Sequence, residues 1–233
     1  MDSTPGTDPQ DTTRVLQPDA WATSTVALSH VKSQNIQVLL FDLGGVLVDF
    51  SGVRDIAALL PAPASPSEIM DRWNRCPLSQ AFGLGKLSAE DYAARFVREW
   101  EIDLEPSGFL EEYRSWSRCL LPGAKELLAL LRPRFRLAAL SNSNELHWDR
   151  NTNDIGVTEL FEVAISSHQV GLRKPDPAIY RLALDRLRVS PDAVLFFDDL
   201  KPNVSAASAL GIRAFQVEGV EEVRRCLVRE HLL

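Results

Sequence analysis

Six polar residues of this sequence could together perform chemistry on a phosphate group. They are Asp42, Ser141, Asn142, Lys174, Asp198 and Asp199. Three carboxylates at close range would repel one another unless a hard cation neutralised them, and oxygen ligands of this kind suit Mg²⁺. A lysine and a hydroxyl beside that cation would hold a dianionic phosphate, and Asp42 could then attack phosphorus to form an aspartyl-phosphate. The set indicates phosphoryl transfer driven by positioning and electrostatic stabilisation.

Each of these residues also has an ordinary structural explanation. An aspartate after a buried strand is often a turn former or a helix cap, Ser141 and Asn142 could simply end a strand, and a lone lysine is usually a surface residue. Taken singly, each residue favours that explanation. Taken together they do not, because four independent strand ends would each have to carry a suitable residue by chance.

Short apolar runs typical of buried strands precede these residues. The runs are 38–41, 136–140, 162–165 and 194–197, and a fifth follows at 213–217. Helical patterns occur between and after them, at 123–131, 177–187 and 221–232. Strands that alternate with helices predict an α/β fold with a parallel sheet covered on both faces. Ligands bind such sheets outside the carboxyl ends of the strands, where the six polar residues would meet.

Residues 51 to about 120 carry no strand-like run and predict helices instead. The helices expected there are 66–73, 89–100 and 106–116. The economical architecture is a helical cap inserted after the first strand of an α/β core. We therefore expect a core of residues 36–52 and 118–233 and a cap of residues 53–117. The polar residues 1–35 predict a disordered tail, because they cannot bury enough surface to offset the entropy lost on ordering.

Composition limits the possible partners. The chain has 233 residues, 45% of them apolar, and 25 Lys and Arg against 32 Asp and Glu give a net charge of −7. A surface of that sign repels phosphate backbones, so we expect no binding to nucleic acid or membranes. No apolar stretch approaches the roughly 20 residues that cross a bilayer, and no secretory signal is recognised. We expect a cytoplasmic protein, monomeric or homodimeric.

Cysteine usage fits a reducing compartment. The three cysteines, Cys76, Cys119 and Cys226, are odd in number and widely spaced. Such spacing predicts neither a disulfide framework nor a zinc site. We expect all three to be buried thiols.

The polar residues belong to four motifs that follow one another in a fixed order. They are 41–46 (FDLGGV), 140–142 (LSN), 174–176 (KPD) and 197–199 (FDD) with Asn203. In order and spacing they resemble the motifs of the haloacid dehalogenase-like hydrolase superfamily, over nearly all of residues 36–233, and the insert resembles the C1 cap of subfamily IA. The resemblance implies a three-layer Rossmann-like domain with strand order 5-4-1-2-3 and a mobile cap that closes over the substrate.

Longer stretches resemble one subgroup of that family, which contains bacterial α-D-glucose-1-phosphate phosphatases and the phosphatase domain of soluble epoxide hydrolases. The stretches are 41–49, 140–147 and 171–180. The resemblance implies that Asp42 is the nucleophile, that Ser141 and Asn142 bind the phosphoryl group, and that Lys174 pairs with both phosphate and nucleophile.

The resemblance also implies a Mg²⁺ site. Its implied ligands are Asp42, Asp198, Asp199, directly or through water, and the backbone carbonyl of Gly44. Gly44 itself departs from the family pattern, because most phosphatases of the superfamily have a second Asp there that protonates the leaving oxygen and then activates water. Three explanations stay open: a substrate with a good leaving group, a replacement such as a cap residue, His147 or an ordered water, or a weak or inactive phosphatase. We favour the first, since the subgroup tolerates a non-acidic residue here.

Three functions are compatible with these residues. The leading hypothesis is a Mg²⁺-dependent phosphatase of a small phosphorylated metabolite, for example a sugar phosphate. A 2-haloacid dehalogenase also uses an aspartate nucleophile without the second Asp, but it needs no metal, so the pair Asp198–Asp199 would be electrostatically costly and unexplained. The third is a catalytically silent binding or regulatory protein, and the presence of Asp42 and Lys174 argues against it.

Several residues are weaker candidates for the site. Trp73, Arg75, Trp100 and Trp116 could line a substrate pocket, although aromatic residues at helical spacing more often form a core. Asp49 could face the pocket or cap the next helix.

Overall fold

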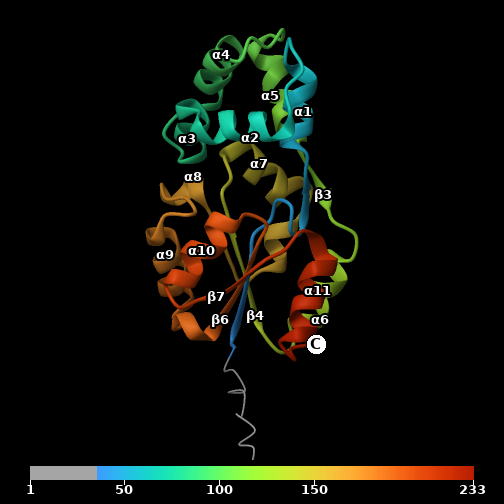
Figure 1. The fold of residues 1–233 in the computed structure, drawn as a ribbon, viewed down its shortest axis with the longest axis vertical. Helices are drawn as coiled ribbons and strands as arrows, with labels where there is room; N and C mark the ends of the chain where they lie inside the picture. Colours follow the sequence, from blue (N-terminus) through green and yellow to red (C-terminus); the bar gives the residue numbers. More distant parts are fainter. Residues whose placement is uncertain (1–35) are drawn as a thin grey trace, which may run out of the picture. The chain divides into compact units, whose positions relative to one another are not determined.

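Five of the six polar residues lie at the ends of strands of the central sheet, and the sixth, Lys174, lies in a loop. The computed structural model describes residues 36–233, so the tail expected for residues 1–35 lies outside the described residues. Five strands form the sheet in the order β5-β4-β1-β6-β7, and every neighbouring pair is parallel (Figure 1). They are β1 (Val38–Phe41), β4 (Arg136–Ser141), β5 (Val163–Ser166), β6 (Val194–Asp198) and β7 (Arg213–Gln216). Counted along the chain, this confirms the predicted order 5-4-1-2-3.

Strand β1 shows why the sheet is covered on both faces. All four of its residues are buried, and they alternate between two separate apolar clusters. Leu39 and Phe41 pack in the first cluster and Val38 and Leu40 in the second, because successive side chains of a strand point to opposite faces. Helices α6 (Ala124–Leu131) and α11 (Gly219–Arg229) contribute to the first cluster; α9 (Pro177–Leu187) and α10 (Lys201–Ala209) contribute to the second. The three layers are visible in Figure 1.

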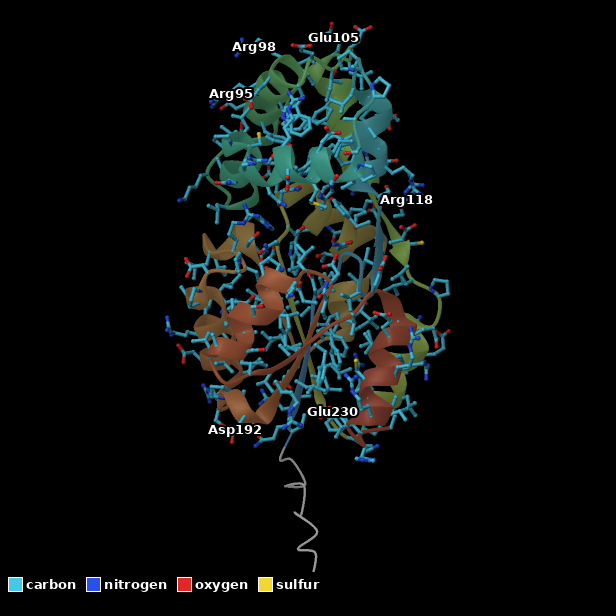
Figure 2. All side chains as sticks on the ribbon, in the orientation of Figure 1. Arg95, Arg98, Glu105, Arg118, Asp192 and Glu230 are labelled. Atoms are coloured by element: carbon cyan, nitrogen blue, oxygen red, sulfur yellow. The ribbon has the colours of Figure 1, made fainter. Side chains whose placement is uncertain are left out.

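The segment after β1 forms a group of helices with its own apolar core. The helices are α1 (Gly52–Leu59), α2 (Pro66–Arg75), α3 (Pro77–Gly83), α4 (Ala89–Glu99) and α5 (Pro106–Ser115). Their cluster contains no residue of the sheet and is rich in aromatic rings, with Phe96 stacked on Trp100 at 4.8 Å and on Phe109 at 5.2 Å between centroids. Charged residues such as Arg95 and Arg98 lie on the outer side of this group (Figure 2).

The expectation that residues 51 to about 120 contain no strand is wrong at their end. β2 (Val48–Phe50) and β3 (Ser117–Leu120) form an antiparallel pair at the base of the helical group. Both strands are short and their burial is mixed, so neither produces a run of apolar residues. Helices α1 and α3 were not predicted either.

The prediction of three buried thiols is wrong for one of them. Cys76 and Cys226 are buried, whereas Cys119 is exposed because it lies on the two-stranded pair rather than in a core. All three are free.

The remaining elements are short and connect the sheet strands. They are α7 (Glu145–Asp149), the π-helix η1 (Arg150–Asp154), the 3₁₀-helix η2 (Val157–Leu160), α8 (Ser167–Val170) and the 3₁₀-helix η3 (Pro191–Ala193). Among residues 36–233, no helix has the length and apolar character needed to cross a membrane.

The helical group contacts the sheet domain closely at the end of α3. The Ser167 hydroxyl donates to the carbonyl of Gly83 over 2.6 Å. Two residues later, Gly85 adopts a φ of +68°, and a Cβ placed there would overlap the carbonyl oxygen of His168. Only glycine permits both the backbone conformation and this close approach.

Replacing Gly85 with alanine should therefore lower the free energy of unfolding by more than the cost of placing alanine at a positive φ. Gly156 is the matched control, since its φ is +71° and nothing lies within 4 Å of an added Cβ. We expect Gly156→Ala to lower the free energy of unfolding by about 1–2 kcal/mol and Gly85→Ala by at least about 3 kcal/mol, measured by urea unfolding. Equal losses in the two variants would show that the approach to His168 adds nothing.

Candidate active site

A buried lysine joins two of the predicted site residues at the carboxyl end of the sheet. Lys174 is 1% exposed, and its Nζ lies 2.9 Å from Asp42 Oδ1 and 2.7 Å from Asp198 Oδ2. Asp42 directly follows β1 and Asp198 ends β6, and these strands pair so that Phe41 stands opposite Phe197. The parallel register thus places the two carboxylates side by side, and Lys174 holds them together.

Asp42 has one carboxylate oxygen held and one free. Oδ1 accepts from Lys174 and from the backbone N–H of Leu43 at 2.7 Å, while Oδ2 makes no hydrogen bond to any of the described residues. Burial raises the pKa of Asp42 to about 8, and the charges of Asp198 and Asp199 act in the same direction while Lys174 opposes them. This carboxylate needs a positive charge beyond Lys174 to stay ionised.

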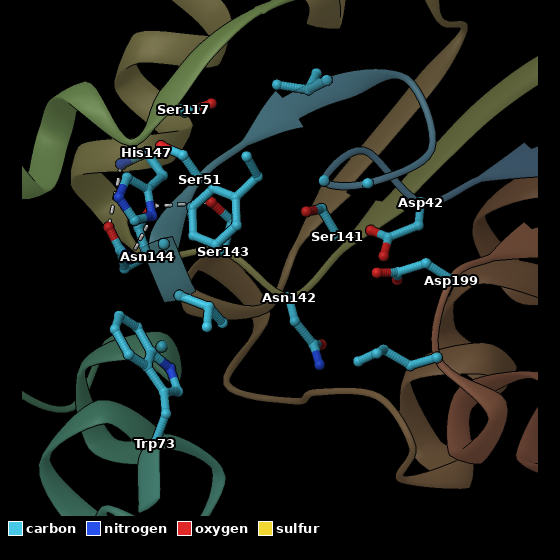
Figure 3. A pocket seen from close by; sticks show the side chains of 18 of the residues that line it. Asp42, Ser51, Trp73, Ser117, Ser141, Asn142, Ser143, Asn144, His147 and Asp199 are labelled. Atoms are coloured by element: carbon cyan, nitrogen blue, oxygen red, sulfur yellow. Dashed lines mark hydrogen bonds between the residues drawn. The ribbon is translucent and has the colours of Figure 1, made fainter. Parts of the chain in front are cut away.

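The neighbouring acidic pair divides into a bonded and an unbonded member. Asp198 is fully buried, and its Oδ1 accepts from the backbone N–H of Leu200 at 2.9 Å and from the Asn203 side chain at 2.8 Å. The carboxylate of Asp199 makes no hydrogen bond to another residue within 36–233, and it lies beside the carboxylate of Asp42 (Figure 3). Burial raises the pKa of Asp199 to about 6, and the charge of Asp198 adds to the effect.

This arrangement fits a divalent cation. Asp42, Asp198 and Asp199 each offer an oxygen, and these oxygens lie within 4.8 Å of one another. Gly44 lines the same cavity, and its carbonyl oxygen accepts no hydrogen bond in the part of the chain described. Three carboxylates, two of which have a pKa that is raised by burial and by mutual repulsion, form the hard oxygen donor set that Mg²⁺ prefers.

Ser141 and Asn142 end β4 beside this cluster but differ in what they contact. The Asn142 side chain bonds the backbone of Lys174 twice: its Nδ2 donates to the carbonyl and its Oδ1 accepts from the N–H, both at 2.8 Å. It thereby fixes the backbone that carries the buried lysine. The Ser141 hydroxyl bonds no described residue and points into the cavity (Figure 3).

Five of the seven predicted site positions line one cavity of about 770 Å³ between the sheet domain and the helical group. The structure therefore brings together all seven predicted site positions. Besides Asp42, Gly44, Ser141, Asn142, Asp199 and the neighbouring Asn203, the lining includes Phe50, Met70, Trp73, Arg173 and Leu200. The other two positions adjoin this lining, because Lys174 contacts Asp42 and Asp198 contacts Lys174.

Sequence reasoning missed several of the lining residues. Arg173 is half-buried and has no carboxylate within ion-pair distance in residues 36–233; its position next to Lys174 was the available signal. Phe50 and Met70 carried no signal, since only the tertiary structure brings β2 and α2 to the cavity.

The weaker candidates divide into lining and core residues. Trp73 and Asp49 line the cavity, and Asp49 does not cap α1, whose N-cap is Ser51. Trp100 and Trp116 are fully buried in the aromatic cluster. Arg75 lies outside the cavity, on the surface side of α2.

His147 is placed as a structural residue rather than as an acid. Its Nε2 lies 2.6 Å from the carbonyl of Tyr113 and its Nδ1 lies 3.0 Å from Asn144 Nδ2, so that Nε2 donates and Nδ1 accepts. Burial lowers the pKa of His147 to about 4. The one N–H proton of this neutral imidazole is donated to the Tyr113 carbonyl. The ring also lies across the cavity from Asp42 (Figure 3), so His147 has no acidic proton to give a leaving group at neutral pH.

The model of a known protein family matches most of this chain. The sequence model of the haloacid dehalogenase-like hydrolases matches residues 36–211. "Phosphatase MT3486" of Mycobacterium tuberculosis is 28% identical over 84% of this chain and 94% of its own length. A "phosphorylated carbohydrates phosphatase" of Thermotoga maritima is 29% identical over 76% of this chain and 82% of its own length.

A solved structure has the same fold. HAD family enzyme bt-2542 of Bacteroides thetaiotaomicron, in complex with magnesium and inorganic phosphate, matches with a TM-score of 0.66 and 20% identity over 78% of this chain and 94% of that chain. At this identity the match supports the fold alone.

The low pKa of His147 predicts a loss of stability in mild acid. In the unfolded chain this side chain takes up a proton near pH 6.5, whereas in the folded protein it does so only near pH 4. Between these values the unfolded state binds more protons, so the free energy of unfolding falls as the pH drops. We expect the wild type to lose about 2 kcal/mol more than His147→Gln between pH 7 and pH 5, measured by urea unfolding. A loss of the same size in both proteins would contradict this assignment.

Proposed function

The chain belongs to the haloacid dehalogenase-like hydrolase family, and from that premise we propose that it is a Mg²⁺-dependent phosphatase of a small phosphorylated metabolite. One observation carries the proposal. Asp42 has one oxygen anchored by Lys174 and the other unbonded, beside the carboxylate of Asp199 and the free hydroxyl of Ser141. This is the arrangement that a nucleophilic carboxylate requires, because the anchored oxygen fixes the direction from which the other attacks.

The chain's own residues would act in two steps. In the first, Lys174 and Ser141 hold the phosphoryl oxygens while Asp42 Oδ2 attacks phosphorus, and the bond to the ester oxygen breaks as the leaving group departs. In the second, water attacks the phosphorus of the aspartyl-phosphate, which releases inorganic phosphate and restores the Asp42 carboxylate. Asn142 positions Lys174 throughout and donates its remaining amide hydrogen to phosphate.

The proposed cofactor is Mg²⁺. Its proposed ligands are Asp42, Asp198, Asp199 and the carbonyl of Gly44, with Asp198 acting directly or through water. The cation would neutralise the three carboxylates and the phosphate, so that an acidic protein can bind an anionic substrate. A dehalogenase needs no metal ion, so the repulsion within this cluster of carboxylates would not be offset by a cation. We therefore prefer the phosphatase.

The helical group is proposed to be the cap. On this proposal residues 53–117 form the cap domain and residues 36–52 and 118–233 the core, joined at β2 and β3. The separate aromatic cluster of the helices supports the division, and the cavity between the two parts supports a role in substrate selection.

Phosphate release should depend on Mg²⁺ and on Asp42. We expect turnover of aryl and acyl phosphates that EDTA abolishes and added Mg²⁺ restores, and a loss of at least about 10³-fold in kcat for Asp42→Asn. Asp103→Asn, an exposed position away from the cavity, is the matched control and should retain full activity. The proposal fails if no ester is hydrolysed with Mg²⁺ or if Asp42→Asn is as active as the wild type.

Gly44 allows the leaving-group explanation to be tested directly. A Cβ at this position would lie 3.4 Å from Phe50 Cβ, an ordinary contact, so an aspartate can be accommodated. We expect Gly44→Asp to raise kcat/KM for alkyl phosphates about 10- to 100-fold and to change acyl phosphates little, because only a poor leaving group needs a proton. The check is kcat/KM across substrates graded by the pKa of the leaving group. A uniform change would count against the explanation.

A further inference from the structure

The cavity gathers exposed apolar side chains from separate segments of the chain. Within residues 36–233, six large apolar side chains are exposed: Phe50, Met70, Leu130, Leu200, Val228 and Leu233. Three of the six line this cavity: Phe50 at 41% exposed, Met70 at 37% and Leu200 at 40%. They come from β2, α2 and the loop after β6, so no single amphipathic element accounts for their exposure. An apolar surface assembled from three segments beside reactive groups is typical of a binding site.

The wall formed by α1 and α2 has the same character. Its apolar members are Val53, Ala57, Pro66, Met70 and Trp73. On α2 the lining positions 66, 70, 73 and 74 fall on one helical face, because residues three and four apart are neighbours on a helix. Only three side chains of α1 and α2 bring hydrogen-bonding groups to the cavity: Arg54, Asn74 and Trp73, whose indole N–H is a single donor on a large apolar ring.

The other polar groups on the helical side of the cavity have partners in the protein. The Tyr113 hydroxyl is bonded by Asn144 Nδ2 at 3.0 Å, and Ser51 bonds Asp55 and Arg118. A carbohydrate bound here would turn several hydroxyls toward α1 and α2 with few partners for them, and each hydroxyl buried without a partner weakens binding. An apolar group would instead displace water from Phe50, Met70 and Leu200.

We propose that the substrate of this site is a phosphate ester or anhydride whose organic part is an aromatic ring or a medium-length aliphatic chain, with its phosphate at Asp42 and its apolar part against Phe50, Met70 and Leu200. This inference rests on the proposed phosphatase function and names its substrate class. The volume of about 770 Å³ accommodates an apolar group larger than a hexose.

The test uses 4-alkylphenyl phosphates with side chains from methyl to hexyl, compared with glucose 1-phosphate. The alkyl chain leaves the pKa of the leaving phenol nearly constant, so any trend reports contact with the cavity wall. We expect kcat/KM to rise about 2- to 4-fold for each added methylene until the cavity is filled. Met70→Gln should lower kcat/KM about 5- to 10-fold for the hexyl compound and less than 2-fold for phenyl phosphate. Leu130→Gln, exposed at 53% on α6 and away from the cavity, should change neither.

Binding separates this inference from the proposed function. Dissociation constants of the matching 4-alkylphenyl phosphonates, which cannot be hydrolysed, are measured in Mg²⁺ through the fluorescence of Trp73 and its neighbours. Affinity that rises with chain length, without hydrolysis of any ester, would overturn the phosphatase and support the apolar site. Hydrolysis with affinity and kcat/KM that are flat across the series, or highest for glucose 1-phosphate, would overturn the apolar substrate and leave the phosphatase standing.

Discussion

The ion cluster around Lys174 is the constraint on which the rest of the site depends. A lysine that is 1% exposed cannot remain charged without close anionic partners, and Asp42 and Asp198 supply them at 2.9 and 2.7 Å. Burial alone would lower the pKa of Lys174, but the two carboxylates outweigh it and raise the pKa. Because the partners stand on neighbouring strands, this one contact fixes the carboxyl ends of β1 and β6 relative to the loop before α9. Asn142 then holds that loop to the end of β4.

Much of this arrangement could be predicted from the sequence, because uninterrupted apolar runs identify the strands of the sheet. Residues 38–41 and 194–197 are apolar without interruption since both faces of the sheet are covered, and the polar residues follow at the strand ends, where a parallel sheet brings them together. The pair β2 and β3 could not be predicted in this way. These strands have only three and four residues of mixed burial, so they show no hydrophobic periodicity. Their pairing depends on contacts between residues about 70 positions apart in the chain.

The parts of the site that escaped prediction share one physical reason. Phe50 and Met70 look like core residues in the sequence, and only their position beside the cavity leaves them exposed. Conversely, Trp100 and Trp116 were candidates for lining the pocket, but both are buried in the aromatic core. His147 looked like a replacement acid, yet burial and two hydrogen bonds keep it neutral. Residue type restricts what a side chain can do, but burial decides which of those possibilities remains.

Two unusual features of the cavity have a common explanation. Gly44 lacks the carboxyl group that would protonate a leaving oxygen, and the space beside it is bordered by the ring of Phe50. A carboxylate added there would be partly desolvated by that ring, and desolvation favours the protonated form of the carboxylate. The added side chain would also cover part of the ring and so reduce the surface that an apolar substrate can contact. A phenolate or a carboxylate departs without a proton, and its organic part can carry apolar surface. A glycine at position 44 and an aromatic ring at position 50 therefore suit the same class of leaving group, the apolar class proposed above, which would bind through surface contact rather than through hydrogen bonds.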